Sequence, residues 1–183
     1  WLVLRDRAGA GDRGVNQLRA AQAHVTTLTI GPQTQRDGDT YTLNPDDGDA
    51  LAACVDHLAQ AAEPWTGVIY LWGLDGSDRP SQAATPLRHL VAWVQAWIRQ
   101  TPAPTHLPKV WIVTPQSQSL PGDRDRGNPF GGLLWGFGQS LALEHPELWG
   151  GLVDLPIAAT AADWEALVTQ LQAPAGRDRV ALR

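Results

Sequence analysis

The sequence has little sulfur and few of the side chains that reductases use for proton transfer. Its 183 residues include one cysteine, one lysine, two tyrosines, two phenylalanines and no methionine. The single cysteine, Cys54, excludes an internal disulfide and a zinc site built from several thiolates, and it favours a reduced, cytosolic compartment. The missing methionine and the abrupt apolar start at 1–4 (WLVL) lead us to expect a segment of a longer protein.

The chain also lacks a dense run of basic residues and a long apolar run. Its formal net charge is -5, whereas non-specific nucleic-acid binding requires a basic surface that displaces counterions. No apolar stretch approaches the ~20 residues of a membrane-spanning helix, and no signal-peptide pattern opens the chain. We therefore expect neither a nucleic-acid nor a membrane partner, and a cytoplasmic location.

Apolar runs and helical periods alternate along the whole sequence. Strands are predicted at 1–4, 25–30, 68–72, 110–114 and 151–155, with a further short strand at 40–43. Helices are predicted after 9–14 as far as residue 23, after 46–47, from 85, from 128 to about 144, and after 160. Several strands are uniformly apolar, which is typical of a parallel sheet covered on both faces. The pattern predicts a single α/β domain.

Three helix starts carry specific capping signals. Asp46 and Asp47 precede one helix as candidate caps, and Asn128-Pro129 offers a cap followed by a proline in the first turn. Thr160 with Asp163 three residues later is a variant of the capping box.

A glycine motif follows the first predicted strand. Residues 9–14 read GAGDRG and match G-x-G-x-x-G through Gly9, Gly11 and Gly14, which would let a backbone approach a pyrophosphate. Three details oppose this hypothesis: three residues separate the strand from Gly9, Asp12 places a carboxylate where the phosphate would lie, and no acidic residue ends the second strand. Arg36 could instead meet a 2′-phosphate. The alternative is a glycine-rich turn in which Asp12 caps its own helix.

The catalytic pair of a short-chain reductase cannot be assembled here. It needs a tyrosine acid and a lysine four residues later on one helix face. Tyr41 is followed at that distance by Pro45 and Tyr70 by Leu74, and the sole lysine, Lys109, lies between a proline and a strand.

Other sites fail on spacing. Residues 138–142 read GQSLA, which imitates a nucleophile elbow but ends in alanine inside a predicted helix, and the last histidine, His145, precedes Asp154. The acidic residues of 37–49 do not fit an EF-hand, and the five histidines are dispersed. We expect no metal site, and we expect Cys54 to be an inert buried thiol.

The second half of the chain contains a distinctive sequence. Residues 130–156 read FGGLLWGFGQSLALEHPELWGGLVDLP, residues 68–75 read VIYLWGLD, and residues 110–114 read VWIVT. Together they closely resemble the ketoreductase region of modular polyketide synthases, and within it the structural subdomain, which is the non-catalytic first half. The block 144–151 (EHPELWGG) is long and idiosyncratic, and the resemblance extends over nearly the whole chain, as far as Arg183.

The resemblance implies a truncated Rossmann-like fold spanning residues 1–183 as one structural subdomain, which packs on and stabilises a catalytic subdomain. In this family the nucleotide-binding glycine loop and the Ser, Tyr, Lys and Asn of the active site belong to that second subdomain. The resemblance therefore implies no catalytic residue, cofactor or metal in this chain, with NADPH bound by the missing half. Gln139 stands where the family often has Arg, and 115–117 (PQS) also depart from its pattern. These departures leave two alternatives open: the parent reductase is active, or it is an inactive pseudo-ketoreductase beside a methyltransferase or enoylreductase domain.

Glycines and tryptophans supply the candidates for contact with a partner. Gly132 and Gly136 fall four residues apart in a predicted helix, where each costs about 1 kcal/mol of stability relative to alanine. Glycines of this kind are expected where another element must approach the helix closely. Trp135 and Trp149 are the further candidates for partner packing, whereas Trp93, Trp97, Trp111 and Trp164 fall on predicted core positions. Two alternatives remain open: a complete Rossmann domain that binds NADP through Gly9–Gly14, and a docking module for a neighbouring synthase domain.

Overall fold

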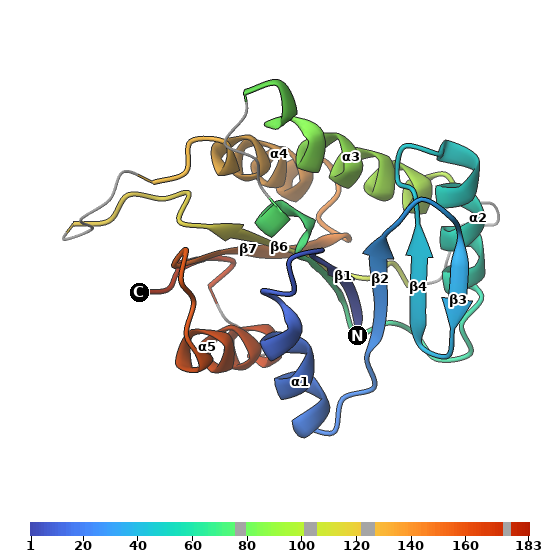
Figure 1. The fold of residues 1–183 in the computed structure, drawn as a ribbon, viewed down its shortest axis with the longest axis horizontal. Helices are drawn as coiled ribbons and strands as arrows, with labels where there is room; N and C mark the ends of the chain where they lie inside the picture. Colours follow the sequence, from blue (N-terminus) through green and yellow to red (C-terminus); the bar gives the residue numbers. More distant parts are fainter. Residues whose placement is uncertain (76–79, 101–105, 122–126, 174–176) are drawn as a thin grey trace.

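The computed structural model describes residues 1–75, 80–100, 106–121, 127–173 and 177–183. In this part of the chain an eight-stranded sheet has the order β3-β4-β2-β1-β5-β6-β7-β8 (Figure 1). The strands are β1 (Leu2–Arg5), β2 (Thr26–Ile30), β3 (Gln35–Asp37), β4 (Thr40–Leu43), β5 (Val68–Tyr70), β6 (Val110–Pro115), β7 (Trp149–Leu155) and β8 (Arg179–Ala181). All neighbours pair in parallel except β3 and β4.

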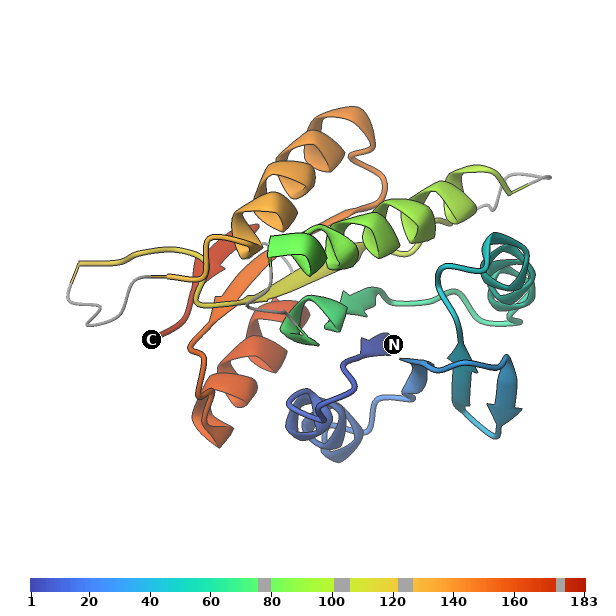
Figure 2. The ribbon, with the colours of Figure 1, turned by 45° about the horizontal axis from the view of Figure 1, so that its top comes forward.

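Helices cover both faces of the sheet. The helices are α1 (Asp12–Ala20), α2 (Gly48–Ala59), α3 (Thr85–Ile98), α4 (Gly131–Glu144) and α5 (Ala161–Gln172). Figures 1 and 2 show α1 and α5 side by side on one face, with α2, α3 and α4 on the other. The predicted parallel α/β fold with helices on both faces is confirmed. No helix in the described ranges is long and apolar enough to cross a bilayer.

The two faces bury separate cores because side chains alternate along each strand. In β1, Leu2 and Leu4 join the core under α2, α3 and α4, whereas Val3 joins the core under α1 and α5. Trp93 and Trp97 are buried in the first core and Trp164 in the second, as predicted. Trp111 is only partly buried and packs against the second core.

The helix boundaries confirm some capping predictions and correct others. Thr160 and Asp163 form the predicted capping box of α5, and the Asp47 side chain accepts the Ala50 N–H at 3.0 Å to cap α2. Asp46 is not a cap; its carboxylate faces α3 instead. Asn128 is also not a cap, because its Oδ1 accepts the Phe130 N–H in a turn and α4 begins only at Gly131.

Two further predictions were wrong at element ends. The first helix ends at Ala20 rather than at residue 23, because the chain turns at Gln22 with a φ of +62°. No strand was predicted between 25–30 and 40–43, but this segment contains β3, whose three residues are all exposed and therefore give no apolar signal. The strands β3 and β4 form an antiparallel hairpin at one edge of the sheet.

Candidate functional site

The glycine motif lies in the loop after β1, at the carboxyl edge of the sheet where open α/β folds bind ligands. Several backbone N–H groups in and just before the motif have acceptors inside the chain. The buried Asp6 carboxylate accepts the N–H groups of Ala10 at 2.7 Å and Gly11 at 2.8 Å. Asp75, which ends the 3₁₀ helix η1 (Trp72–Asp75), accepts the N–H of Arg7 at 2.8 Å. Protein carboxylates thus accept the N–H groups of Arg7, Ala10 and Gly11 in this loop.

The structure gives a reason for each glycine of the motif, either its backbone conformation or close packing. Gly9 has a φ of +77°, a conformation that favours glycine. A Cβ on Gly11 would lie 2.3 Å from Cδ1 of Leu71, and one on Gly14 would lie 2.7 Å from Cε3 of Trp164. The glycines therefore bring the loop onto β5 and bring α1 onto α5.

Asp12 does not cap α1, so that prediction was wrong. The N-cap residue of α1 is Gly11, and no side chain caps the helix. The Asp12 carboxylate instead receives both Nε and Nη2 of Arg5, the latter at 3.0 Å. The hydrogen bond from Arg5 to Asp12 raises the pKa of the guanidinium. The negative charge predicted at the helix start is present, but it is paired.

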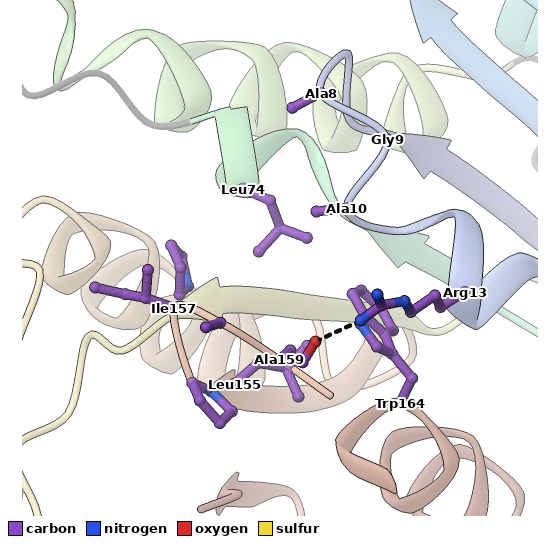
Figure 3. Close-up of a pocket in the computed structure, with 12 residues that line it drawn as sticks. Ala8, Gly9, Ala10, Arg13, Leu74, Leu155, Ile157, Ala159 and Trp164 are labelled. Carbon is purple, nitrogen blue, oxygen red and sulfur yellow. Dashed lines mark hydrogen bonds between the residues drawn. The ribbon is translucent and has the colours of Figure 1, made fainter. Parts of the chain in front are cut away.

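A cavity of about 320 Å³ opens between the loop after β1 and the loop after β7. Figure 3 shows Leu74 and Ala10 on one side, Leu155 and Ile157 on the other, and Arg13 with Trp164 towards one end. Its walls are otherwise small or apolar: Ala8, Gly9, Pro115, Pro156, Ala158 and Ala159.

A second cavity, of about 260 Å³, lies at the start of α3 and is more polar. Its lining includes His89, whose buried ring packs edge-on against Trp72 and makes a 3.2 Å contact with the Asp46 carboxylate. Asp46 also accepts Nη2 of Arg88 at 2.9 Å. Burial lowers the pKa of His89, and this effect outweighs the opposing influence of Asp46.

Asp154, at the end of β7, is fully buried and organises the neighbouring loop. It accepts Oγ1 of Thr114 at 2.6 Å and the N–H groups of Ser117 at 2.7 Å and Gln118 at 3.0 Å. Nη2 of Arg183 donates to Oδ2, the oxygen that also accepts the Gln118 N–H, at 3.0 Å. One carboxylate thereby joins β6, β7, the loop after β6 and the last described residue. Sequence reasoning treated Asp154 only as a hydrolase acid and missed this role.

The four partner-packing candidates differ in their exposure. Gly132 and Gly136 lie on the exposed side of α4, and a Cβ on either would meet no atom within 4 Å. Trp135 and Trp149 are partly buried against the first core. Their indole N–H groups donate to Thr114 Oγ1 at 2.9 Å and to Asp178 Oδ2 at 3.0 Å respectively.

The residues that failed the reductase spacing test also lie apart in the fold. Tyr70 is buried in β5 and donates its hydroxyl to the carbonyl of Pro86; burial raises its pKa well above the usual value. Tyr41, on β4, lies under the guanidinium of Arg36 at 5.1 Å, so Arg36 is directed to a ring rather than towards the glycine loop. Lys109 donates to the carbonyl of Trp149 at 3.1 Å.

Two smaller expectations concern metals and thiols. Cys54 is buried as predicted. Among the described residues, no group of three or more His, Cys, Asp or Glu side chains is arranged to hold a metal ion.

Comparisons with known proteins find similar sequences in very large proteins. No protein-family model matches the chain. It is 38% identical over 171 residues to the pikromycin polyketide synthase component PikAIII of Streptomyces venezuelae, covering 91% of this chain and 9% of that protein. It is 32% identical over 185 residues to PikAII of the same organism, covering 100% of this chain and 5% of that protein. The chain thus spans less than a tenth of these relatives.

Solved structures that are similar to this chain also come from polyketide synthase ketoreductases. A C2-type ketoreductase from a modular polyketide synthase superposes with a TM-score of 0.78 at 30% identity, covering 100% of this chain and 38% of that one. The first ketoreductase of the tylosin polyketide synthase gives a TM-score of 0.73 at 28% identity, covering 100% and 36%. A multidomain structure with adenylation, ketoreductase and pseudo Asub parts gives 0.78 at 14% identity, covering 100% and 16%, which shows a shared fold.

Proposed function

This chain is related to the ketoreductase regions of modular polyketide synthases, and on that premise we propose that it is their structural subdomain, without catalysis or cofactor binding of its own. Its function is to pack on and stabilise an NADPH-dependent catalytic subdomain or a neighbouring synthase domain in the cytoplasm. The whole of residues 1–183 forms this one unit.

The observation that carries the proposal is the occupation of the glycine loop by carboxylates. A dinucleotide-binding loop needs free N–H groups and positive potential at the start of its helix. Here Asp6 and Asp75 accept the loop N–H groups, and Asp12 adds a third carboxylate beside the same loop. A phosphate would have to displace these acceptors and lie against their charge. The residues present therefore do not fit NADP.

The exposed side of α4 is the surface that we assign to the partner. Between Gly131 and Leu143 this helix has no charged residue. Leu143 is 84% exposed and Leu133 is 42% exposed, beside the bare backbone at Gly132 and Gly136. Solvated helix faces are normally charged, whereas small and apolar positions let another helix approach closely. We call this face, defined by Gly132, Leu133, Gly136 and Leu143, the α4 face.

The occupant that we propose is the catalytic subdomain. The similar ketoreductase chains are covered over only 36–38% of their length, although this chain is covered completely. The rest of such a chain is large enough to bury an apolar helix face of this kind. A methyltransferase or enoylreductase domain is the alternative occupant if the parent region is a pseudo-ketoreductase; Gln139, also exposed on α4, is among the departures that favour it.

Titration of NADPH into the chain by calorimetry tests the cofactor part of the proposal. We expect no saturable heat up to about 1 mM NADPH, the upper end of ordinary substrate affinities. Saturable binding in the micromolar range would overturn it and would favour a complete Rossmann domain.

Co-expression with the adjoining catalytic segment tests the packing part. We expect the two parts to co-purify and the melting temperature of this chain to rise. Gly136→Arg, which places a long charged side chain on the α4 face, should abolish co-purification. Asn16→Arg is the matched control, because it makes the same kind of change at an exposed site of α1 on the opposite side of the sheet. Equal loss with both variants, or no co-purification of the parent chain, would contradict the assignment.

A further inference from the structure

We propose that the cavity between the β1–α1 and β7–α5 loops binds a small organic carboxylate with an apolar body, and that Arg13 pairs with its carboxylate. This cavity lies on the face covered by α1 and α5, whereas the α4 face lies on the opposite side of the sheet. The inference therefore does not rest on the proposed function, and either can fail without the other.

Position and shape favour a ligand site. The cavity lies beyond the carboxyl ends of β1, β6 and β7. This is the edge at which open parallel sheets bind ligands. Its volume of about 320 Å³ lies at the small end of the range for ligand pockets. That size suits a compact molecule.

The walls define the body of the ligand. Leu74 and Leu155 face one another across the cavity, Trp164 contributes the side of its ring, and Ile157 stands 67% exposed at the rim (Figure 3). Leu155 and Trp164 are otherwise part of the buried core. Leu155 and Trp164 are already almost fully buried, so an apolar body in the cavity would chiefly remove the surface of Ile157 and of the partly buried Leu74 from water.

The charges around the cavity define its polar end. Nη1 of Arg13 donates to the carbonyl of Ala159 at 3.0 Å, and among the described residues no carboxylate lies within ion-pairing distance of this guanidinium. The nearby acids are engaged elsewhere: Asp12 pairs with an arginine of β1, and Asp6 and Asp75 accept backbone N–H groups. Arg13 is thus a cation beside the cavity that no described carboxylate pairs with.

A carboxylate fits this cation better than a phosphate does. The guanidinium presents paired N–H donors that match two oxygens of either anion, so the difference lies in the other donors that are free. A phosphate would need additional donors from the loop, and the loop N–H groups of Ala10 and Gly11 are taken by Asp6. One cation beside several apolar side chains therefore favours a monocarboxylate.

Binding of hexanoate to the ¹⁵N-labelled chain, followed by backbone amide shifts, tests the inference. We expect saturable shifts at residues 8–13 and 157–159, with a dissociation constant on the order of 0.1–1 mM for so small a ligand. Hexanamide, which has the same shape without the charge, should bind at least about tenfold more weakly because it forms no charge-assisted pair with Arg13.

Two variants and two controls locate the site. Arg13→Gln should weaken hexanoate binding about tenfold, and Ala10→Phe, which fills the cavity from an exposed position, should abolish it. Arg19→Gln and Ala20→Phe make the same exchanges at exposed positions of α1 outside the cavity and should leave binding unchanged. Melting temperatures report whether each variant is folded. Absence of saturable shifts, equal binding of hexanamide, or unchanged binding by folded Ala10→Phe would each overturn the inference.

Discussion

Gly14 and Trp164 touch across the α1–α5 interface, so that a Cβ on Gly14 would lie 2.7 Å from Cε3 of the indole. Trp164 is buried and its ring has no room to move aside. The last glycine of the motif therefore serves helix packing. We expect Gly14→Ala to lower the free energy of unfolding by about 1–3 kcal/mol, the usual cost of overpacking. Urea denaturation measures this change, and a variant as stable as the parent would contradict the tight contact.

At Gly136, replacement by alanine should change the free energy of unfolding in the opposite direction. It lies inside α4 with open space around its Cα, so the added methyl group meets nothing and only the helix propensity changes. Gly136→Ala should raise the free energy of unfolding of the isolated chain by up to about 1 kcal/mol. On the proposed function it should also weaken co-purification with the catalytic segment, because the methyl group stands in the α4 face. Stabilisation with undiminished co-purification would place the partner elsewhere.

Asp154 should be among the most costly residues to truncate. Asp154→Ala leaves the donors of Thr114 and of the following loop buried without an acceptor and also unpairs Arg183. We expect a loss of about 3–5 kcal/mol in the free energy of unfolding. Asp49→Ala, an exposed acid in the first turn of α2, is the control and should cost less than about 1 kcal/mol. Comparable losses for the two variants would contradict the network.

The lowered pKa of His89 predicts a dependence of stability on pH. Burial keeps the folded ring neutral despite Asp46, while Arg88 also disfavours its protonation. As pH falls through the ordinary histidine value of 6.5, the unfolded chain takes up a proton that the folded chain does not bind. The free energy of unfolding should therefore fall in this window. His89→Gln should remove that part of the slope, whereas exposed His106→Gln should not; equal slopes for the two variants would refute the prediction.

Cys54 should react only when the chain opens. Burial raises the pKa of its thiol to about 11, and the residue is 7% exposed on α2. At pH near 8 the folded chain should react with Ellman's reagent at least about 100-fold more slowly than the urea-unfolded chain, because the thiolate is the reacting form. Rapid labelling under folding conditions would show that α2 is not held against the sheet.

Local signals in the sequence predicted the elements whose cause is local. The Thr160–Asp163 capping box lies within one turn of helix, and the apolar stripe that follows it needs no distant partner to be recognised. The alternation of Leu2, Val3 and Leu4 between two cores follows from strand geometry once helices are known to cover both faces. The strand β3 was not predicted, because its residues Gln35–Asp37 are exposed and give no apolar pattern. Only its pairing with β4 defines it as a strand.

The site depends on contacts between segments that are far apart, which pattern alone does not reveal. The spacing of Gly9, Gly11 and Gly14 suggested a phosphate-binding loop. In the structure the N–H of Arg7, just before this motif, donates instead to Asp75, which lies in the segment after β5. The sequence placed the Asp12 carboxylate beside this loop, but it did not reveal the pairing of Asp12 with Arg5. Arg13 drew no attention in the sequence, because its importance arises from a cavity whose other wall is formed by residues 155–159.

The hairpin at one edge of the sheet has a consequence for association between chains. An unpaired sheet edge is a template on which another chain can add a strand, and proteins counter this with short, charged edge strands. The edge strand β3 has three exposed residues, among them Arg36 and Asp37, and the opposite edge strand β8 is equally short and begins at the exposed Arg179. Both ends of an otherwise parallel, apolar sheet are therefore poor templates for uncontrolled strand addition and fibrillar aggregation.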